Sequence, residues 1–176
     1  MFSNPERNLL QLGDITGFSV ADLGAGSGIY SFVSAVRVGP SGQVYSVDVK
    51  RDLVKKIYSQ TLENKIHNIQ HIWGDVERPY GTRLADDSVD VVIASNLFFQ
   101  LEDKDACVRE ISRILKNGGK VLFIDWADSF SNMGPHPNHI VDEAYARNLF
   151  NKRGFKLHDR IDAGDFHYGI IFIHEK

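Results

Sequence analysis

A short apolar run followed by a glycine-rich turn constrains the fold of this chain more than any other feature of its sequence. Residues 18–22 (FSVAD) have the composition of a short buried strand, and residues 29–38 have that of a helix. Three glycines lie between them: Gly24, Gly26 and Gly28. Glycine lets the backbone approach a ligand closely, and the N-terminus of a helix offers free N–H groups to an anion. We therefore expect a ligand-binding loop between a strand and a helix.

Strand and helix signals alternate along the rest of the 176 residues. Further strands are expected at 43–49, 69–73, 90–95, 120–126, 155–162 and 166–174, and further helices around Leu53–Leu62 and at about 103–116, with a stop at Gly118, and 141–152. Strands joined by helical crossovers form a parallel sheet, and the turn at 163–165 predicts a closing hairpin. We predict a doubly wound, mostly parallel, seven-stranded α/β sheet with an antiparallel C-terminal strand and helices on both faces.

No repeat or change in composition marks a domain boundary, so we expect a single domain over residues 1–176. Within it, residues 1–16 are expected to form a short N-terminal helical cap, and residues 127–139 a loop on the substrate side. Only about 17 residues precede the first strand. The substrate site is therefore either open, or closed by the 127–139 loop or by a second copy of the chain in a homodimer.

Charge and composition exclude several classes of partner. The formal net charge of −3 gives no general attraction to nucleic acids or anionic membranes. The single cysteine, Cys107, excludes a disulfide framework and fits a reducing compartment. No apolar run approaches the roughly 20 residues of a membrane span, and no signal peptide opens the chain, so we expect a cytoplasmic protein. The histidines lack metal-binding spacing, so we expect no metal site.

One acidic residue stands at the end of the second predicted strand, and another stands just after the third. Asp48 stands 24 residues after Gly24, near the spacing at which a carboxylate accepts hydrogen bonds from ribose hydroxyls; alternatively, it only caps the next helix. Asp75 can accept a hydrogen bond from an exocyclic amine such as that of adenine, or it is only a turn residue. Ile29 stands where the dinucleotide pattern G-x-G-x-x-G needs its third glycine, which disfavours a pyrophosphate.

Together these segments resemble the class I S-adenosylmethionine-dependent methyltransferases over nearly the whole chain. ADLGAGSG is similar to that family's first motif, VYSVDV to its ribose-binding strand, GDVE to its adenine-binding turn and DVVIASNLFF to its fourth motif; RILKNGGKVLFIDW is similar to the helix–turn–strand that follows. The resemblance implies S-adenosylmethionine as cofactor and S-adenosylhomocysteine as product. It implies these cofactor-binding residues: Asp22, Gly24, Gly26, Gly28, Asp48, Asp75, Val76, Asn96 and Leu97.

The resemblance also implies a role for each residue. The three glycines would line the methionine moiety, and Asp22 would hold its amino group directly or through water. Asp48 would bind the ribose, and Asp75 the adenine N6, with Val76 beside the ring. The segment that begins at Asn96 follows the fourth strand, where the family brings donor and acceptor together.

The acceptor side depends on less specific residues. Asn96 and Phe98 are expected to build the methyl-transfer pocket, with Phe98 and Phe99 as an apolar wall, unless one of these rings enters the core. His136 and His139 in the 127–139 loop are candidate general bases, which are needed only where the acceptor starts protonated. The alternative is that both are solvated loop residues.

Two further places contribute weaker candidates on the acceptor side. Asp125-Trp126 ends the fifth strand and points toward the same rim. His167-Tyr168, near the closing hairpin, is the weakest candidate.

The details after the fourth strand are most similar to the small-molecule methyltransferases of ubiquinone and menaquinone C-methylation and of arsenite methylation. Arsenite methylation depends on several thiolates, and this chain has only Cys107. The N/D-P-P-Y/F tetrad typical of base-methylating relatives is missing at 95–98. We therefore expect methyl transfer to a small organic molecule, with the acceptor and the methylated atom left open. The alternatives are a protein or RNA acceptor, a nucleotide-dependent oxidoreductase, or a non-catalytic cofactor-binding module.

Overall fold

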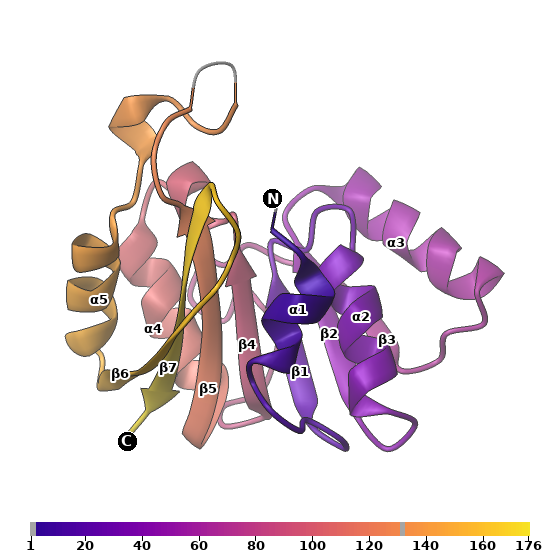
Figure 1. Cartoon of the computed structure of the whole chain (residues 1–176). Coiled ribbons are helices and arrows are strands. Elements are labelled where there is room, and N and C mark those ends of the chain that lie inside the picture. The colour runs from indigo at the N-terminus through magenta and orange to yellow at the C-terminus, as the bar shows by residue number, and fades with distance from the viewer. Residues whose placement is uncertain (1–2, 131–132) are drawn as a thin grey trace.

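The computed structural model describes residues 3–130 and 133–176. Its strands are β1 (Ser19–Leu23), β2 (Gln43–Asp48), β3 (Ile69–Trp73), β4 (Val89–Ser95), β5 (Leu115–Trp126), β6 (Phe155–Ile161) and β7 (His167–His174). They form one seven-stranded sheet in the order β3-β2-β1-β4-β5-β7-β6 (Figure 1). The pairs from β3 to β5 are parallel, whereas β7 runs antiparallel to both β5 and β6.

Helices cover both faces of this sheet. They are α1 (Pro5–Leu10), α2 (Ile29–Val38), α3 (Arg51–Glu63), α4 (Lys104–Ile114) and α5 (Glu143–Asn151), with short 3₁₀ turns η1 (Phe98–Gln100) and η2 (Pro137–His139). α1 and α2 pack on one face, and α4 and α5 pack on the other (Figure 1). Asn4, Asp103 and Asp142 accept backbone N–H groups at the starts of α1, α4 and α5, which fixes where these helices begin. The predicted fold class is confirmed.

The two faces bury separate apolar clusters. On the α1 face, Leu9 and Leu12 pack with alternate residues of the sheet, among them Ile171. On the α4 face, aromatic rings dominate, and the rings of Phe150 and Phe172 stack with their centroids 4.5 Å apart. Because side chains along a strand alternate between faces, the two clusters define which residues of β7 face α1 and which face α4.

Two details of the sequence prediction were wrong. The helix expected to run to about residue 116 ends at Ile114, and β5 already begins at Leu115, which pairs with Val89 of β4. Gly118, the predicted helix stop, lies inside β5 with a φ of +75°. The apolar residues Leu53, Val54, Ile57 and Leu62 have the spacing of one helix face, but Leu62 is 61% exposed. At the end of α4, pairing with the sheet overrides the local helical pattern.

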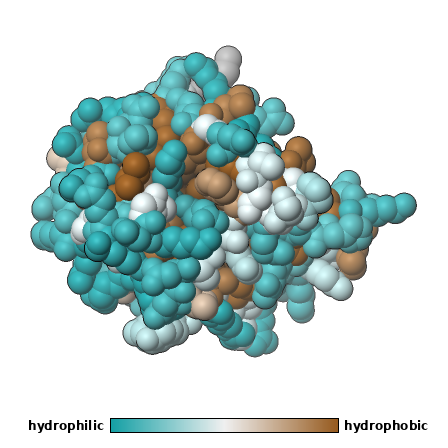
Figure 2. All heavy atoms as spheres, turned by 90° about the horizontal axis from the view of Figure 1, so that it is seen from below, coloured by the Kyte–Doolittle hydropathy of each residue, from teal (hydrophilic) through white to brown (hydrophobic). Residues whose placement is uncertain are grey.

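The sheet order places the functional edge of the molecule. β1 and β4 are neighbours in the sheet. The chain leaves β1 toward β2 on one side and leaves β4 toward β5 on the other side, so the loops after β1 and β4 diverge. In such sheets a ligand binds at this divergence, beyond the carboxyl ends of the strands. That edge is uppermost in Figure 1. Figure 2 views the molecule from below, on the side away from that edge, where hydrophilic residues predominate and hydrophobic ones gather in patches between them.

None of the helices in the described ranges combines the length and the apolar character that a membrane-spanning helix needs.

Candidate functional site

The glycine loop is held in a conformation that only glycine adopts readily. Gly24, Gly26 and Gly28 have φ values of +69°, +57° and +82°. A Cβ on Gly24 would lie 2.7 Å from Cδ1 of Leu97, and one on Gly28 would lie 2.9 Å from Cγ1 of Ile57. Gly24 therefore allows contact with the segment after β4, whereas Gly28 allows α3 to pack against the start of α2.

A cavity of about 460 Å³ opens beside this loop, and we call it the glycine-loop cavity. It lies at the carboxyl ends of the strands from β3 to β4, at the divergence of loops described above. Its lining includes many of the residues implied by the family resemblance: Gly24, Gly26, Asp48, Asp75, Val76 and Leu97. The other implied residues, Asp22, Gly28 and Asn96, lie outside this lining, at the base of the loop and after β4.

Asp48 ties the glycine loop to the start of α3. Its Oδ2 accepts a hydrogen bond from the backbone N–H of Gly26 at 2.9 Å, and its Oδ1 accepts one from Lys50 at 2.8 Å. The residue is only 7% exposed. An ionised carboxylate has about four lone-pair positions, so both oxygens can accept a further hydrogen bond from a ligand in the cavity. The two roles weighed for Asp48, at the helix start and toward a ligand, are therefore compatible.

Asp22 lies beneath the loop and not in the cavity wall. It is 2% exposed, and its Oδ2 accepts a hydrogen bond from Oγ of Ser31 at 2.6 Å. Burial raises the pKa of Asp22 to about 6, although the hydrogen bonds from Ser31 oppose the rise. Ser31 was missed by the sequence analysis, because a serine in a helix gives no signal that its hydroxyl serves a distant carboxylate.

Asp75 and Val76 form the far wall of the cavity. Oδ1 of Asp75 accepts a hydrogen bond from the backbone N–H of Glu77 at 3.0 Å, and Oδ2 lies 3.5 Å from Nε of Arg78. Val76 is 7% exposed and offers an apolar surface to the cavity. Asp75 is thus a turn residue that also borders the cavity.

Asn96 follows β4 with a strained backbone and an unsatisfied side chain. Its φ is +53°, and its carbonyl oxygen accepts a hydrogen bond from Nε2 of Gln100 at 2.8 Å. Its Oδ1 is buried and has no hydrogen-bond partner in the described part of the chain. Strain and an unpaired acceptor that occur together next to a cavity are typical of a ligand-binding position.

The two phenylalanines after β4 have different environments. Phe98 is fully buried, and its ring packs edge-on against Phe123 at a centroid distance of 4.9 Å. Phe99 lines a second cavity. Of the two arrangements left open by the sequence, Phe98 is the ring that enters the core, and Phe99 is the ring available to a ligand.

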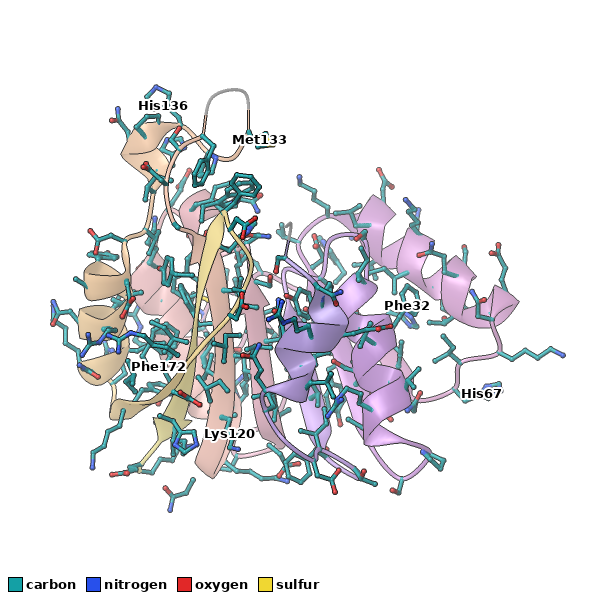
Figure 3. All side chains as sticks on the ribbon, viewed as in Figure 1. Phe32, His67, Lys120, Met133, His136 and Phe172 are labelled. Atoms are coloured by element: carbon teal, nitrogen blue, oxygen red, sulfur yellow. The ribbon has the colours of Figure 1, made fainter. Side chains whose placement is uncertain are left out.

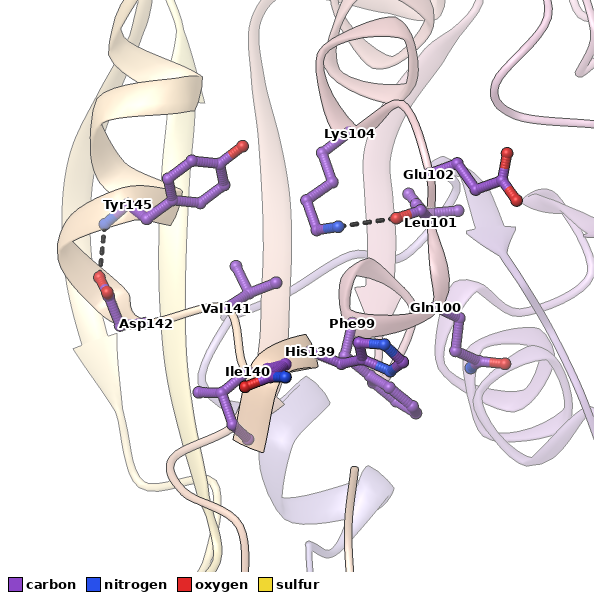
Figure 4. A pocket seen from close by; sticks show the side chains of 11 residues that line it. Phe99, Gln100, Leu101, Glu102, Lys104, His139, Ile140, Val141, Asp142 and Tyr145 are labelled. Carbon is purple, nitrogen blue, oxygen red and sulfur yellow. Dashed lines mark hydrogen bonds between the residues drawn. The ribbon is translucent and has the colours of Figure 1, made fainter. Parts of the chain in front are cut away.

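The second cavity, which we call the η1–α5 cavity, has a volume of about 640 Å³. It is lined by Phe99, Gln100, Leu101, Glu102, Lys104, Asn138, His139, Ile140, Val141, Asp142 and Tyr145 (Figure 4). Gln100 and Leu101 also line the glycine-loop cavity, so the two cavities adjoin at these side chains. The sequence did not single out Leu101, because its position between two cavities depends on the tertiary fold.

The two candidate histidines differ in position. Both are exposed, and their ring centroids lie 6.2 Å apart. His139 lines the η1–α5 cavity, whereas His136 does not and instead accepts a hydrogen bond from the backbone N–H of Asn138 at the start of η2. Figure 3 shows His136 at the outer end of the loop.

The predicted cap at 1–16 includes residues 1–2, and the predicted loop at 127–139 includes residues 131–132. These four residues lie outside the described part of the chain.

Asp125 anchors η1 to the end of β5. Its Oδ2 accepts a hydrogen bond from the backbone N–H of Phe99 at 3.3 Å, and it is 1% exposed. Burial raises its pKa to about 6, against the effect of backbone hydrogen bonds from Trp126, Phe99 and Phe98. The position of the cavity-lining η1 turn therefore depends on a buried carboxyl group.

Among residues 3–130 and 133–176, no three His, Cys, Asp or Glu side chains group so as to hold a metal ion.

Several known proteins are similar to this chain. A family described as "Methyltransferase domain" matches residues 16–157. A demethylmenaquinone methyltransferase of Lactococcus lactis is 29% identical over 68% of this chain and 46% of that protein. An arsenite methyltransferase of Halobacterium salinarum is 31% identical over 62% of this chain and 27% of that protein. A solved structure of a SAM dependent methyltransferase from Aquifex aeolicus superposes with a TM-score of 0.89 at 23% identity, covering 98% of this chain and 90% of that one.

These matches show the family. The chain belongs to the methyltransferase-domain family, and its fold is that of the class I S-adenosylmethionine-dependent methyltransferases. It spans between 27% and 53% of the length of the curated relatives that it matches. The resemblance inferred from the sequence motifs is thus confirmed.

Proposed function

We propose that this chain binds S-adenosylmethionine in the glycine-loop cavity and transfers its methyl group to a small organic acceptor. The observation that carries the proposal is the junction of two cavities at Gln100 and Leu101. One cavity has a glycine loop and two carboxylates suited to a nucleoside, and the other is larger and open to a second molecule. Adjoining cavities allow a donor and an acceptor to meet, as methyl transfer requires.

Each part of the cofactor has a suitable partner. Asp48 has free lone pairs for the ribose hydroxyls, and Asp75 borders the cavity where the adenine amine would lie beside Val76. Gly24 and Gly26 admit the methionine moiety close to the backbone. The buried Asp22 acts from beneath the loop, either toward the amino group through water or by holding Ser31 and the loop in place. Gly28 contributes the bend that starts α2.

The acceptor would lie beyond η1, over the ends of β4 and β5. Phe99 and Ile140 offer apolar surface there, and His139 offers a titratable ring. The named relatives act on a demethylmenaquinone or on arsenite. Cys107 is fully buried, and burial raises the pKa of its thiol, so this chain provides no exposed thiolate for arsenic. These features favour an organic acceptor.

The chemistry requires mainly orientation. The methyl carbon of a sulfonium is electrophilic, and its leaving group is a neutral thioether. Holding an acceptor atom in line with this carbon at roughly 3 Å therefore lowers the activation barrier mainly by proximity and orientation. The new bond forms between the acceptor atom and the methyl carbon while the sulfur–carbon bond breaks. A base is needed only where the acceptor carries a proton, and His139 is the better placed of the two candidate histidines.

Methyl-labelled S-adenosylmethionine added to a cell extract tests the proposal. We expect label to enter small molecules in the presence of the chain, and the Asp48→Ala variant to serve as a control with weakened cofactor binding. Label in protein or RNA would instead support a macromolecular acceptor. Cofactor binding without any release of S-adenosylhomocysteine would support a non-catalytic binding module. Binding of NADH together with hydride transfer would support an oxidoreductase.

The same proposal covers the domain organisation, location and partners of the enzyme. We propose that the chain works as one domain, with the N-terminal cap and the 127–139 loop, or a second copy in a homodimer, around the acceptor. We further propose a cytoplasmic location and no nucleic-acid partner, in keeping with a net charge of −3.

A further inference from the structure

Two buried polar side chains at the carboxyl edge of the sheet have atoms without hydrogen-bond partners. Asn8 of α1 is 1% exposed, and its Oδ1 is unpaired within the described residues. His167, the first residue of β7, is 9% exposed, and both of its ring nitrogens are unpaired within those residues. A buried donor or acceptor without a partner is costly, so native proteins seldom keep several in one region without a ligand or a function.

Asn8 and His167 flank the same turn. Asn8 lines a small cavity of about 230 Å³ together with Asn4, Arg7 and residues 162–165, the turn between β6 and β7. The backbone N–H of His167 donates to the carbonyl oxygen of Gly164 in that turn at 3.4 Å. His167 precedes Ile171 by four positions, and Ile171 packs with α1, so the two residues of β7 point to the same face. The unpaired atoms of Asn8 and His167 are therefore on the α1 face at the same end of the sheet.

The surroundings of His167 connect it to the acceptor side. It pairs across strands with Trp126, the last residue of β5, and the centroids of the two rings lie 4.4 Å apart. Trp126 is in turn covered by the 127–139 loop, because a Cβ on Gly134 would lie 2.8 Å from the indole ring. The neighbouring Asp125 bonds to Phe99 of the η1–α5 cavity. The end of β5 thus separates that cavity on one face from His167 on the other.

Burial lowers the pKa of His167, which keeps its imidazole neutral near pH 7. A neutral imidazole carries one N–H donor and one nitrogen acceptor. The ring can therefore donate to one ligand atom and accept from another, as a hydroxyl group allows. Both ring nitrogens are buried, so a ligand reaches them only after a neighbouring side chain moves, and the hydrogen bonds that the ligand then makes would offset part of the cost of that movement.

We propose that His167 holds the methyl acceptor by a polar group, most simply a hydroxyl, which hydrogen-bonds to the imidazole beside the indole of Trp126. The inference rests on the proposed function and adds a specificity residue and a substrate feature to it. The acceptor then spans the end of β5, with one part in the η1–α5 cavity and its hydroxyl at His167.

His167→Phe and His167→Gln test this role. The phenylalanine keeps an aromatic ring against Trp126 and removes both nitrogens, whereas the glutamine keeps one donor and one acceptor. His174→Phe is the matched control, because His174 is a buried histidine on the same strand at the opposite end of the sheet. Its Nε2 lies 3.0 Å from Oγ of Ser112, and its Nδ1 is unpaired within the described residues, so the variant shows what loss of a buried imidazole does away from the proposed site. Three readouts are compared: transfer of label from methyl-labelled S-adenosylmethionine into the extract fraction that the wild-type chain labels, cofactor affinity by calorimetry, and thermal unfolding.

We expect His167→Phe to slow label transfer by about tenfold, the loss of roughly one hydrogen bond, while cofactor affinity and unfolding temperature stay near wild type. His167→Gln should recover part of the rate, and His174→Phe should transfer label as wild type does. Equal transfer by His167→Phe and wild type, or an equal loss in His174→Phe, would overturn the inference alone. If the wild-type chain binds cofactor but labels nothing, the proposed function fails as well, which separates the two cases.

Discussion

At the level of single residues, Asp48 connects two elements that border the glycine-loop cavity. It accepts hydrogen bonds from Gly26 and Lys50, so it holds both the glycine loop and the start of α3 at the cavity. We expect Asp48→Ala to weaken S-adenosylmethionine binding by about 1–3 kcal/mol, because it removes the acceptor that we propose for the ribose and a support of the glycine loop. Isothermal calorimetry measures the change. Asp52→Ala, an exposed acidic residue in the first turn of α3, is the control and should bind as wild type. Unchanged affinity in Asp48→Ala would refute the assignment.

Gly24 supports a second prediction, which concerns close approach. A methyl group on Gly24 would collide with Leu97, and the φ of +69° is unfavourable for alanine. We expect Gly24→Ala to lower both cofactor affinity and the unfolding temperature. Gly13→Ala separates the two causes, because Gly13 has a φ of +84° and a Cβ added to it would meet nothing within 4 Å. It should lose about 1–2 kcal/mol of stability without loss of cofactor affinity. If both variants bind cofactor equally well, contact with Leu97 plays no part in the site.

At the level of elements, η1 carries one ring into the core and one toward the acceptor. Phe98→Ala should destabilise the fold by about 3–5 kcal/mol, because it empties a fully buried site among Phe123 and Phe150. Phe99→Ala should change stability far less and should instead slow methyl transfer, since Phe99 lines the η1–α5 cavity. Urea unfolding and the label-transfer assay separate the two effects. Similar unfolding free energies for both variants would contradict this division.

The types of the elements followed from the sequence better than their ends did. The helix at 29–38 was predicted with its observed bounds because both of its ends carry glycine signals. The end of α4 was missed because Leu115 joins the sheet through pairing with Val89, a contact that no local pattern encodes. Similarly, Asp48 and Asp75 could be proposed for the site because they stand at or just after the carboxyl ends of strands. Ser31 and Leu101 could not, because their roles depend on residues brought together only by the fold.

At the level of the whole molecule, the carboxyl edge of the sheet gathers groups that do not favour stability. Asp22 and Asp125 are buried acids at the ends of β1 and β5, and both have a pKa raised to about 6. Asn96 and His167 add buried atoms without partners within the described residues. The opposite ends of the same strands carry apolar residues such as Val20 and Val91 in the core. Unpaired buried atoms also occur elsewhere in the described residues, as at Nδ1 of His174, but the two buried acids with a raised pKa lie at the carboxyl edge. Groups that cost stability are expected beside a binding site, because a ligand rather than the fold can satisfy them.

The raised pKa of Asp22 predicts a specific dependence of stability on pH. An acid whose pKa is about 6 when folded and about 3.9 when unfolded binds more protons in the folded state between these values, so its contribution to stability falls as the pH rises through this range. Asp22→Asn removes that contribution while keeping an oxygen that can accept the hydrogen bond from Ser31.

Urea unfolding of the wild type and of Asp22→Asn at pH 4.5 and pH 7.5 measures the effect of Asp22. From the lower to the higher pH, the wild type should lose about 2 kcal/mol of unfolding free energy relative to the variant. Asp52→Asn, at an exposed position, should follow the wild type at both pH values. A difference between wild type and Asp22→Asn that stays constant with pH would mean that Asp22 is ionised in the folded protein as readily as in the unfolded chain. In that case burial would not be what governs the carboxyl group beneath the glycine loop.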